Sequence, residues 1–130
     1  MLYLDSSALV KLVITEPESQ ALAHWLAERA DLALVSSALH RTEVPRAVWK
    51  ADPSGLPRSF RQMRSVQKVN VTTAILESAS AIPPQSLRSA DAIHLASAVS
   101  IRRDLTVFVA YDKRLLAAAK DAGLPTACPA

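Results

Sequence analysis

The chain has very few glycines and a single cysteine, and each scarcity excludes a class of function. With only Gly55 and Gly123, it can form neither a Walker A loop nor a GxGxxG dinucleotide turn, so nucleotide binding through these motifs is excluded. Its one cysteine, Cys128, allows no internal disulfide and no zinc site made of cysteines alone. Two Trp, two Tyr and two Phe are too few for base stacking to dominate any recognition of nucleic acid.

Long hydrophobic runs are also missing. No apolar run approaches the roughly 20 residues that cross a bilayer, and the segment from Met1 to Asp5 shows no basic leader. We therefore expect a soluble, cytoplasmic protein without membrane association. Of the 130 residues, 50% are hydrophobic and 21% are charged, which excludes disorder and predicts one globular domain over residues 1–130.

Short apolar segments alternate with longer helical patterns along the chain. Strands are expected at residues 2–4, 32–35, 68–71, 106–110 and 126–128. Helices are expected after Ser6 or Ser7, from Pro17 to about Arg29, and over residues 38–50, 58–66, 72–81, 87–103 and 112–122. This alternation predicts an α/β fold with a central parallel sheet of four to five strands flanked by helices.

Several residues mark where the expected helices begin, bend or end. Thr72 or Thr73 is suited to cap one helix, and Gly123 is suited to close the last one. Pro45 lies inside the expected helix 38–50, where it should remove a backbone hydrogen bond and bend the helix.

Four acidic residues lie in apolar or small-residue surroundings, namely Asp5, Glu43, Asp91 and Asp112. Asp5 and Asp112 could be ordinary helix N-caps, and Asp91 could favour the first turn of its helix through the helix dipole. Glu43 is at the margin of a core-facing stripe and needs a polar partner. All four converge on one pocket if the first strand is central, because parallel strands end at the same edge of a sheet.

An acidic pocket of this kind points to metal-dependent hydrolysis. Clustered carboxylates raise one another's pKa, so such a cluster persists mainly when it binds a cation or shares a proton. Oxygen ligands without cysteine or paired histidine suit Mg²⁺ or Mn²⁺. A water bound to such an ion can hydrolyse a phosphodiester bond.

Other polar residues near these acids have less certain roles. Ser7 could cap the first helix, orient Asp5 or bond a metal-bound water. His40 precedes Glu43 by three residues, within reach of a hydrogen bond. His94 is interpreted as a packed, hydrogen-bonded histidine rather than a catalytic base.

Positive charge is concentrated in the middle of the chain. Residues 41–68 hold seven of the 15 Lys and Arg but two of the 12 Asp and Glu, so the segment carries +5 and the remainder −2. On one helix face, Arg61, Arg64 and Lys68 would form a track for RNA phosphates, although such a face is often merely solvated.

Four motifs, in this order, resemble the PIN-domain ribonucleases, specifically the VapC-type toxins of bacterial type II toxin–antitoxin systems. They cover the whole chain: Tyr3-Leu-Asp5-Ser-Ser-Ala-Leu-Val-Lys11, Arg-Thr-Glu43-Val-Pro-Arg-Ala, Leu87-Arg-Ser-Ala-Asp91-Ala-Ile-His-Leu-Ala96, and Tyr111-Asp112-Lys-Arg-Leu115 with Gly123-Leu-Pro125. The third motif is the most specific.

The resemblance implies a PIN-like fold and an Mg²⁺- or Mn²⁺-dependent endoribonuclease. It also implies Asp5, Glu43, Asp91 and Asp112 as catalytic residues, the three aspartates as metal ligands, a homodimer, and a cognate VapB-like antitoxin. The sequence departs from the family pattern at Ala110, where similar proteins often carry Thr or Ser.

Other functions remain open beside this one. A haloacid-dehalogenase-type phosphatase would need a second aspartate at the position of Ser7, and a receiver domain would need paired acids where Asp5 is followed by Ser6. A catalytically weak or silent PIN-like module that binds RNA or protein is the alternative that Ala110 favours.

Overall fold

The computed structural model describes all 130 residues, and its centre is a five-stranded parallel sheet. The strand order is β3-β2-β1-β4-β5, so the first strand of the chain is the central one. Every neighbouring pair is parallel. The strands are β1 (Leu2–Leu4), β2 (Leu34–Ser37), β3 (Gln67–Val69), β4 (Val107–Val109) and β5 (Thr126–Ala127).

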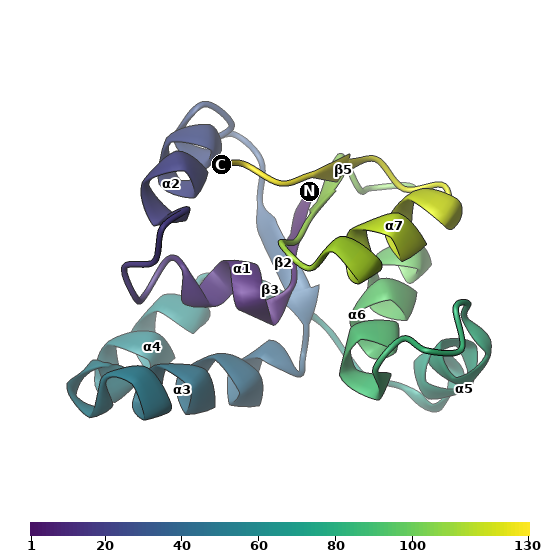
Figure 1. Ribbon diagram of the computed structural model, residues 1–130, viewed down its shortest axis with the longest axis horizontal. Coiled ribbons are helices and arrows are strands. Elements are labelled where there is room, and N and C mark those ends of the chain that lie inside the picture. Colours follow the sequence, from purple (N-terminus) through teal and green to yellow (C-terminus); the bar gives the residue numbers. More distant parts are fainter.

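Helices cover both faces of this sheet (Figure 1). On one side lie α1 (Ser6–Val10), α2 (Ser19–Ala27), α3 (His40–Ala51) and α4 (Leu56–Met63), the last preceded by the 3-10 turn η1 (Pro53–Gly55). On the other side lie α6 (Ser89–Ser100) and α7 (Lys113–Asp121), with α5 (Thr73–Ala81) packed against α6. None of these helices has the length and apolar character that a membrane span requires. The prediction of an α/β fold with a central parallel sheet is confirmed.

The alternation of side chains along β1 and β4 explains the two-sided packing. Leu2 and Leu4 join the core formed with α1 to α4, whereas Tyr3 joins the core formed with α6 and α7. Phe108 of β4 packs on the same face as Tyr3, with the two rings stacked at 5.2 Å. Successive side chains of a strand point to opposite faces, so continuous apolar strands require a helix layer on each side.

Two expected elements occupy different residues in the structure. The second strand was expected at residues 32–35 but is Leu34–Ser37, because its polar end is buried rather than turned to solvent. The helix expected at 58–66 ends at Met63, so Lys68 lies in β3. The prediction that Lys68 shares a helix face with Arg61 and Arg64 is therefore wrong.

Helix ends follow the sequence signals in most places. Thr72 caps α5 by accepting a hydrogen bond from the Ile75 amide, and Gly123 after α7 has a φ of 86°, a conformation that favours glycine. Helix α3 continues through Pro45 to Ala51, since one missing N–H removes a single bond of the ladder.

Candidate active site

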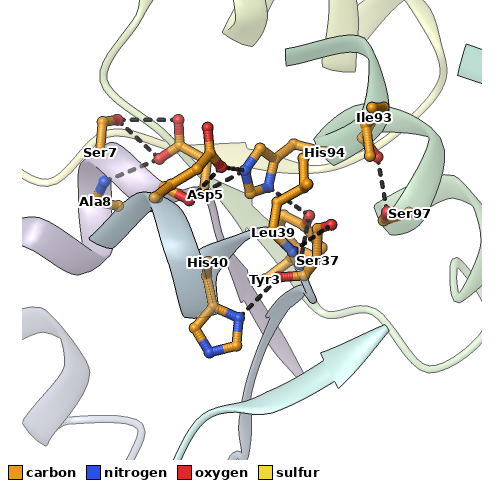
Figure 2. A network of polar contacts seen from close by, with 12 residues as sticks. Tyr3, Asp5, Ser7, Ala8, Ser37, Leu39, His40, Ile93, His94 and Ser97 are labelled. Carbon is orange, nitrogen blue, oxygen red and sulfur yellow. Dashed lines mark hydrogen bonds and ion pairs between the residues drawn. The ribbon is translucent and has the colours of Figure 1, made fainter. Parts of the chain in front are cut away.

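Asp5 lies directly after the central strand and is almost completely buried. Its amide donates to the Val109 carbonyl at 3.2 Å, which places it beside the end of β4. Its Oδ1 accepts the Ala8 amide at 2.9 Å, so Asp5 itself, and neither serine, caps α1. The Ser7 hydroxyl lies 2.9 Å from both carboxylate oxygens and orients them (Figure 2). Burial raises the pKa of Asp5, and the charge of Asp91 raises it further.

Asp91 and Asp112 meet in one pocket at the carboxyl-terminal edge of the sheet. Asp112 caps α7 by accepting the Leu115 amide at 2.9 Å, and Asp91 lies in the first turn of α6. Burial raises the pKa of Asp91, and the charges of Asp112 and Glu43 add to this effect. The carboxylates therefore interact electrostatically, although Asp5 and Asp112 are also the N-caps that the simpler interpretation expected.

The pocket that holds Asp91 and Asp112 has a volume of about 330 Å³ and is bordered by positive charge. Its lining includes Arg88 from the start of α6 and Lys113 and Arg114 from the start of α7. The ion pairs of the molecule involve other residues, so these three cations are unpaired. A pocket with two carboxylates and three free cations suits a phosphate together with a divalent ion.

Glu43 is held at one carboxylate oxygen by two side chains. His94 Nε2 and the Ser6 hydroxyl each lie 2.8 Å from Oε1, whereas Oε2 has no protein partner. Burial alone would raise the pKa of Glu43, but the hydrogen bonds from His94 and Ser6 outweigh it, and the pKa lies below its ordinary value. Glu43 is thus an ionised carboxylate in a half-buried setting.

The two histidines near Glu43 differ in their contacts. His94 is 2% exposed and bonds Glu43, as expected for a packed histidine. His40 instead places Nδ1 2.7 Å from the Ser37 carbonyl, so the expected hydrogen bond between His40 and Glu43 does not form. The partner that Glu43 requires comes from α6.

A metal site must be assembled from this arrangement, because no three His, Cys, Asp or Glu side chains lie close enough together to form a complete ligand set. The donors nevertheless fit Mg²⁺ or Mn²⁺. They are carboxylate oxygens, and the raised pKa values of Asp5 and Asp91 show a local excess of negative charge and burial. Mg²⁺ usually keeps several waters and binds through one or two carboxylates, so a closed protein cage is not required.

The sequence interpretation missed Ser6, Arg88, Lys113 and Arg114. All four are adjacent, or nearly adjacent, to an acidic residue of the quartet. That proximity to motif acids was the available signal for the three cations. The expected cations Arg61, Arg64 and Lys68 are exposed and line none of the pocket that holds Asp91 and Asp112.

Comparisons with known proteins agree with this geometry. The family model of the PIN domain matches residues 2–121. Ribonuclease VapC35 of Mycobacterium tuberculosis is 41% identical over 131 residues, covering 99% of this chain and 97% of that protein. Ribonuclease VapC47 of the same species is 39% identical over 132 residues, with coverage of 99% and 97%.

A solved structure shows the same fold at low sequence identity. The crystal structure of Mycobacterium tuberculosis VapC20, described as a Sarcin-Ricin loop cleaving toxin, aligns with a TM-score of 0.73 and 15% identity. The alignment covers 95% of this chain and 96% of VapC20. Fold, motif order and sequence identity over nearly the full length agree, and the chain therefore belongs to the PIN domain family, among its VapC-type ribonuclease toxins.

Proposed function

We propose that this protein is an Mg²⁺- or Mn²⁺-dependent endoribonuclease that acts as the toxin of a toxin–antitoxin pair. The observation that carries this proposal is the pocket in which Asp91 and Asp112 lie beside three unpaired cations. The carboxylates suit a hydrated divalent ion, and the cations suit the phosphates of RNA. The VapC relatives named as ribonucleases support the same reaction class.

The quartet divides into metal ligands and a proton acceptor. Asp5, Asp91 and Asp112 would hold the ion, and Ser7 keeps both oxygens of Asp5 in place. The bound ion would polarise a phosphoryl oxygen and lower the pKa of a water that attacks phosphorus. Glu43 Oε2, free of protein partners on an ionised carboxylate, is the atom available to accept a proton from attacking water.

RNA would be bound through its backbone. Arg88, Lys113 and Arg114 lie in the pocket and would contact phosphates next to the scissile one. Arg61, Arg64 and Lys68 are proposed as more distant contacts for a longer RNA. They follow or belong to α4 and β3, on the other side of the molecule from α6 and α7 (Figure 1).

A VapB-like antitoxin is the proposed protein partner, and a homodimer the proposed assembly. The groove lined by α3 and the start of α4 exposes Trp49 at 53% and Phe60 at 48%, with Arg41 and Arg46 at its border. Apolar anchors with cationic borders suit an amphipathic segment that carries acidic residues. The antitoxin is therefore assigned to this groove.

The direct test is cleavage of total RNA by the purified protein, with Mg²⁺, with Mn²⁺ and with excess chelator. Cleavage is expected with either ion and absent in chelator. Asp91→Asn is the matched control, because it removes one charge with little change in shape. Glu43→Gln should also be inactive while keeping a wild-type circular-dichroism spectrum, since the amide is nearly isosteric. Undiminished cleavage in chelator would contradict the metal-dependent reaction.

The alternative is a PIN-like module that binds RNA or protein without cutting. Ala110 favours it, because this fully buried position brings no hydroxyl to the end of β4. In the same assay, retained RNA without cleavage under every metal condition would support this alternative. Ala110→Thr would then be the informative variant, with recovered cleavage locating the defect at this position.

A further inference from the structure

A chain of hydrogen bonds runs from the middle of the sheet to Glu43. The Ser37 amide donates to the Tyr3 hydroxyl at 2.9 Å, and that hydroxyl lies 2.8 Å from His94 Nδ1. His94 Nε2 in turn lies 2.8 Å from Glu43 Oε1 (Figure 2). The chain therefore links β2, β1, α6 and α3 across residues that are far apart in sequence.

The donors in this chain can be assigned from the available protons. Tyr3 keeps its proton, because complete burial raises its pKa strongly. Its oxygen already accepts the Ser37 amide, so its own O–H is free to donate to His94 Nδ1. Nδ1 then carries no proton, and the neutral imidazole has its N–H at Nε2, where it donates to Glu43.

Packing leaves the imidazole little freedom. Tyr3 is 0% exposed and His94 is 2% exposed, and their rings meet edge to face at 6.0 Å. Both ring nitrogens of His94 are engaged, Nδ1 by Tyr3 and Nε2 by Glu43 with Ser6 nearby at 3.2 Å. A histidine in this state has no free nitrogen for proton exchange with RNA or water.

Glu43 needs such an anchor. Its charge raises the pKa of Asp91, so the two carboxylates repel each other, and its side chain is 35% exposed with several rotatable bonds. Without a fixed donor, repulsion and side-chain entropy would turn the carboxylate toward solvent. His94 and Ser6 hold Oε1 and leave Oε2 open.

We propose that Tyr3 and His94 are positioning residues that fix the Glu43 carboxylate at the active site, with His94 as a neutral donor rather than a proton-transfer group. The catalytic consequence rests on the function proposed above. The arrangement of Tyr3, His94 and Glu43 is testable without RNA.

The kinetic test compares two polar replacements of His94 that differ in one bond. In His94→Gln, the side-chain amide can reach the place of Nε2 and donate to Glu43. In His94→Asn, the shorter amide reaches only the place of Nδ1 and keeps the bond to Tyr3. His94→Asn is expected to lower kcat about 100-fold with little change in KM, and His94→Gln to recover most of that loss. Equal loss in both variants, a change in KM alone, or no change would overturn the positioning role.

A second measurement separates this proposal from the proposed reaction. Long-range ¹H–¹⁵N spectra of the wild-type protein should show His94 as a neutral imidazole protonated at Nε2, and Tyr3→Phe should shift its Nδ1 resonance. Crystal structures should show one position for the Glu43 carboxylate in wild type and His94→Gln, and several in His94→Asn. If the wild type cleaves no RNA, the ribonuclease function fails and these two results decide the positioning role. A proton on Nδ1, or an unmoved carboxylate in His94→Asn, would overturn it.

Discussion

The Asp5 carboxylate combines a structural contact with a place in the candidate site. Its oxygens accept the Ala8 amide and the Ser7 hydroxyl, yet a carboxylate offers about four acceptor sites, so capacity for a cation remains. Cap and ligand are therefore compatible roles for the same side chain. The pKa of Asp5, raised by burial and by Asp91, marks the electrostatic strain that a cation would relieve.

Asp91→Asn is expected to stabilise the protein in the absence of divalent metal. The substitution removes one of the repelling charges, and the gain should be about 1 kcal/mol or less after solvent screening, a few degrees in melting temperature. Thermal melts in chelator at pH 7 would measure it. Mg²⁺ or Mn²⁺ should stabilise the wild type and have little effect on the variant.

The pH dependence of this difference has a defined sign. Asp5 and Asp91 have folded-state pKa values raised above 3.8, so the folded protein binds more protons than the unfolded chain between 3.8 and those values. Their unfavourable contribution is therefore fully present above the raised values and fades as the pH falls toward 3.8. Glu43, whose pKa is lowered from 4.5, stabilises the fold above 4.5 and loses this effect below it. An advantage of Asp91→Asn that grows on acidification would contradict the repulsion.

At the scale of elements, helix α7 separates capping from chemistry at a single residue. Asp112→Asn keeps an acceptor for the Leu115 amide, whereas Asp112→Ala removes it. Asp112→Ala should be less stable than Asp112→Asn by about 1 kcal/mol, because an N-cap bond is lost. Both variants should lose RNA cleavage, since both lack the charge. Urea unfolding and the cleavage assay together check this, and a stable, active Asp112→Asn protein would reduce Asp112 to a cap.

Elements with strong local signals were predictable from the sequence, and contacts between distant elements were not. The capping of α5 by Thr72 and the glycine after α7 depend on neighbouring residues, so the pattern reveals them. Strand β2 was displaced because the sheet buries Ser36 and Ser37, a tertiary effect that overrides their polarity.

The same distinction applies to the candidate site. The four acids could be selected because their local surroundings and motif order are visible in the chain. The pairing of Glu43 with His94 spans 51 positions and depends on how α3 and α6 pack. No spacing rule connects two such residues, so their contact requires the three-dimensional arrangement.

For the whole molecule, the distribution of cations predicts two kinds of RNA contact. In an Asp91→Asn background, Arg88→Ala with Arg114→Ala should reduce the magnitude of the salt slope by about 0.7 for each lost phosphate contact on single-stranded RNA. The matched pair Arg61→Ala with Arg64→Ala removes the same charge on the other side of the sheet. It should reduce the slope only for RNA long enough to reach α4.

Filter binding over a range of salt concentrations would measure both pairs. If the Arg61 and Arg64 pair leaves the slope unchanged for every RNA length, that face is simply solvated. If the Arg88 and Arg114 pair leaves it unchanged, the phosphate contacts assigned to the pocket are wrong.

The exposed aromatic surface predicts how the antitoxin binds. Trp25, an obvious sequence candidate, is partly buried with the Arg29 guanidinium 3.9 Å above its ring, so Phe60 joins Trp49 as the exposed pair. Trp49→Ser with Phe60→Ser should weaken antitoxin binding by at least tenfold, about 1.4 kcal/mol or more, and leave the RNA cleavage rate unchanged. Calorimetry and sedimentation at micromolar concentration would test this. Unaltered affinity would place the antitoxin elsewhere, and a monomer alone would contradict the proposed homodimer.

The central position of β1 also determines when the protein can become active during its own synthesis. This first strand pairs with β4 more than 100 residues later, from Leu2 to Val107, and Asp112 follows β4. A nascent chain on the ribosome therefore lacks both the second neighbour of its central strand and one acid of its quartet until translation is almost complete. Products of interrupted translation are inert, so the cell meets this activity only as finished molecules, which an antitoxin can bind one for one.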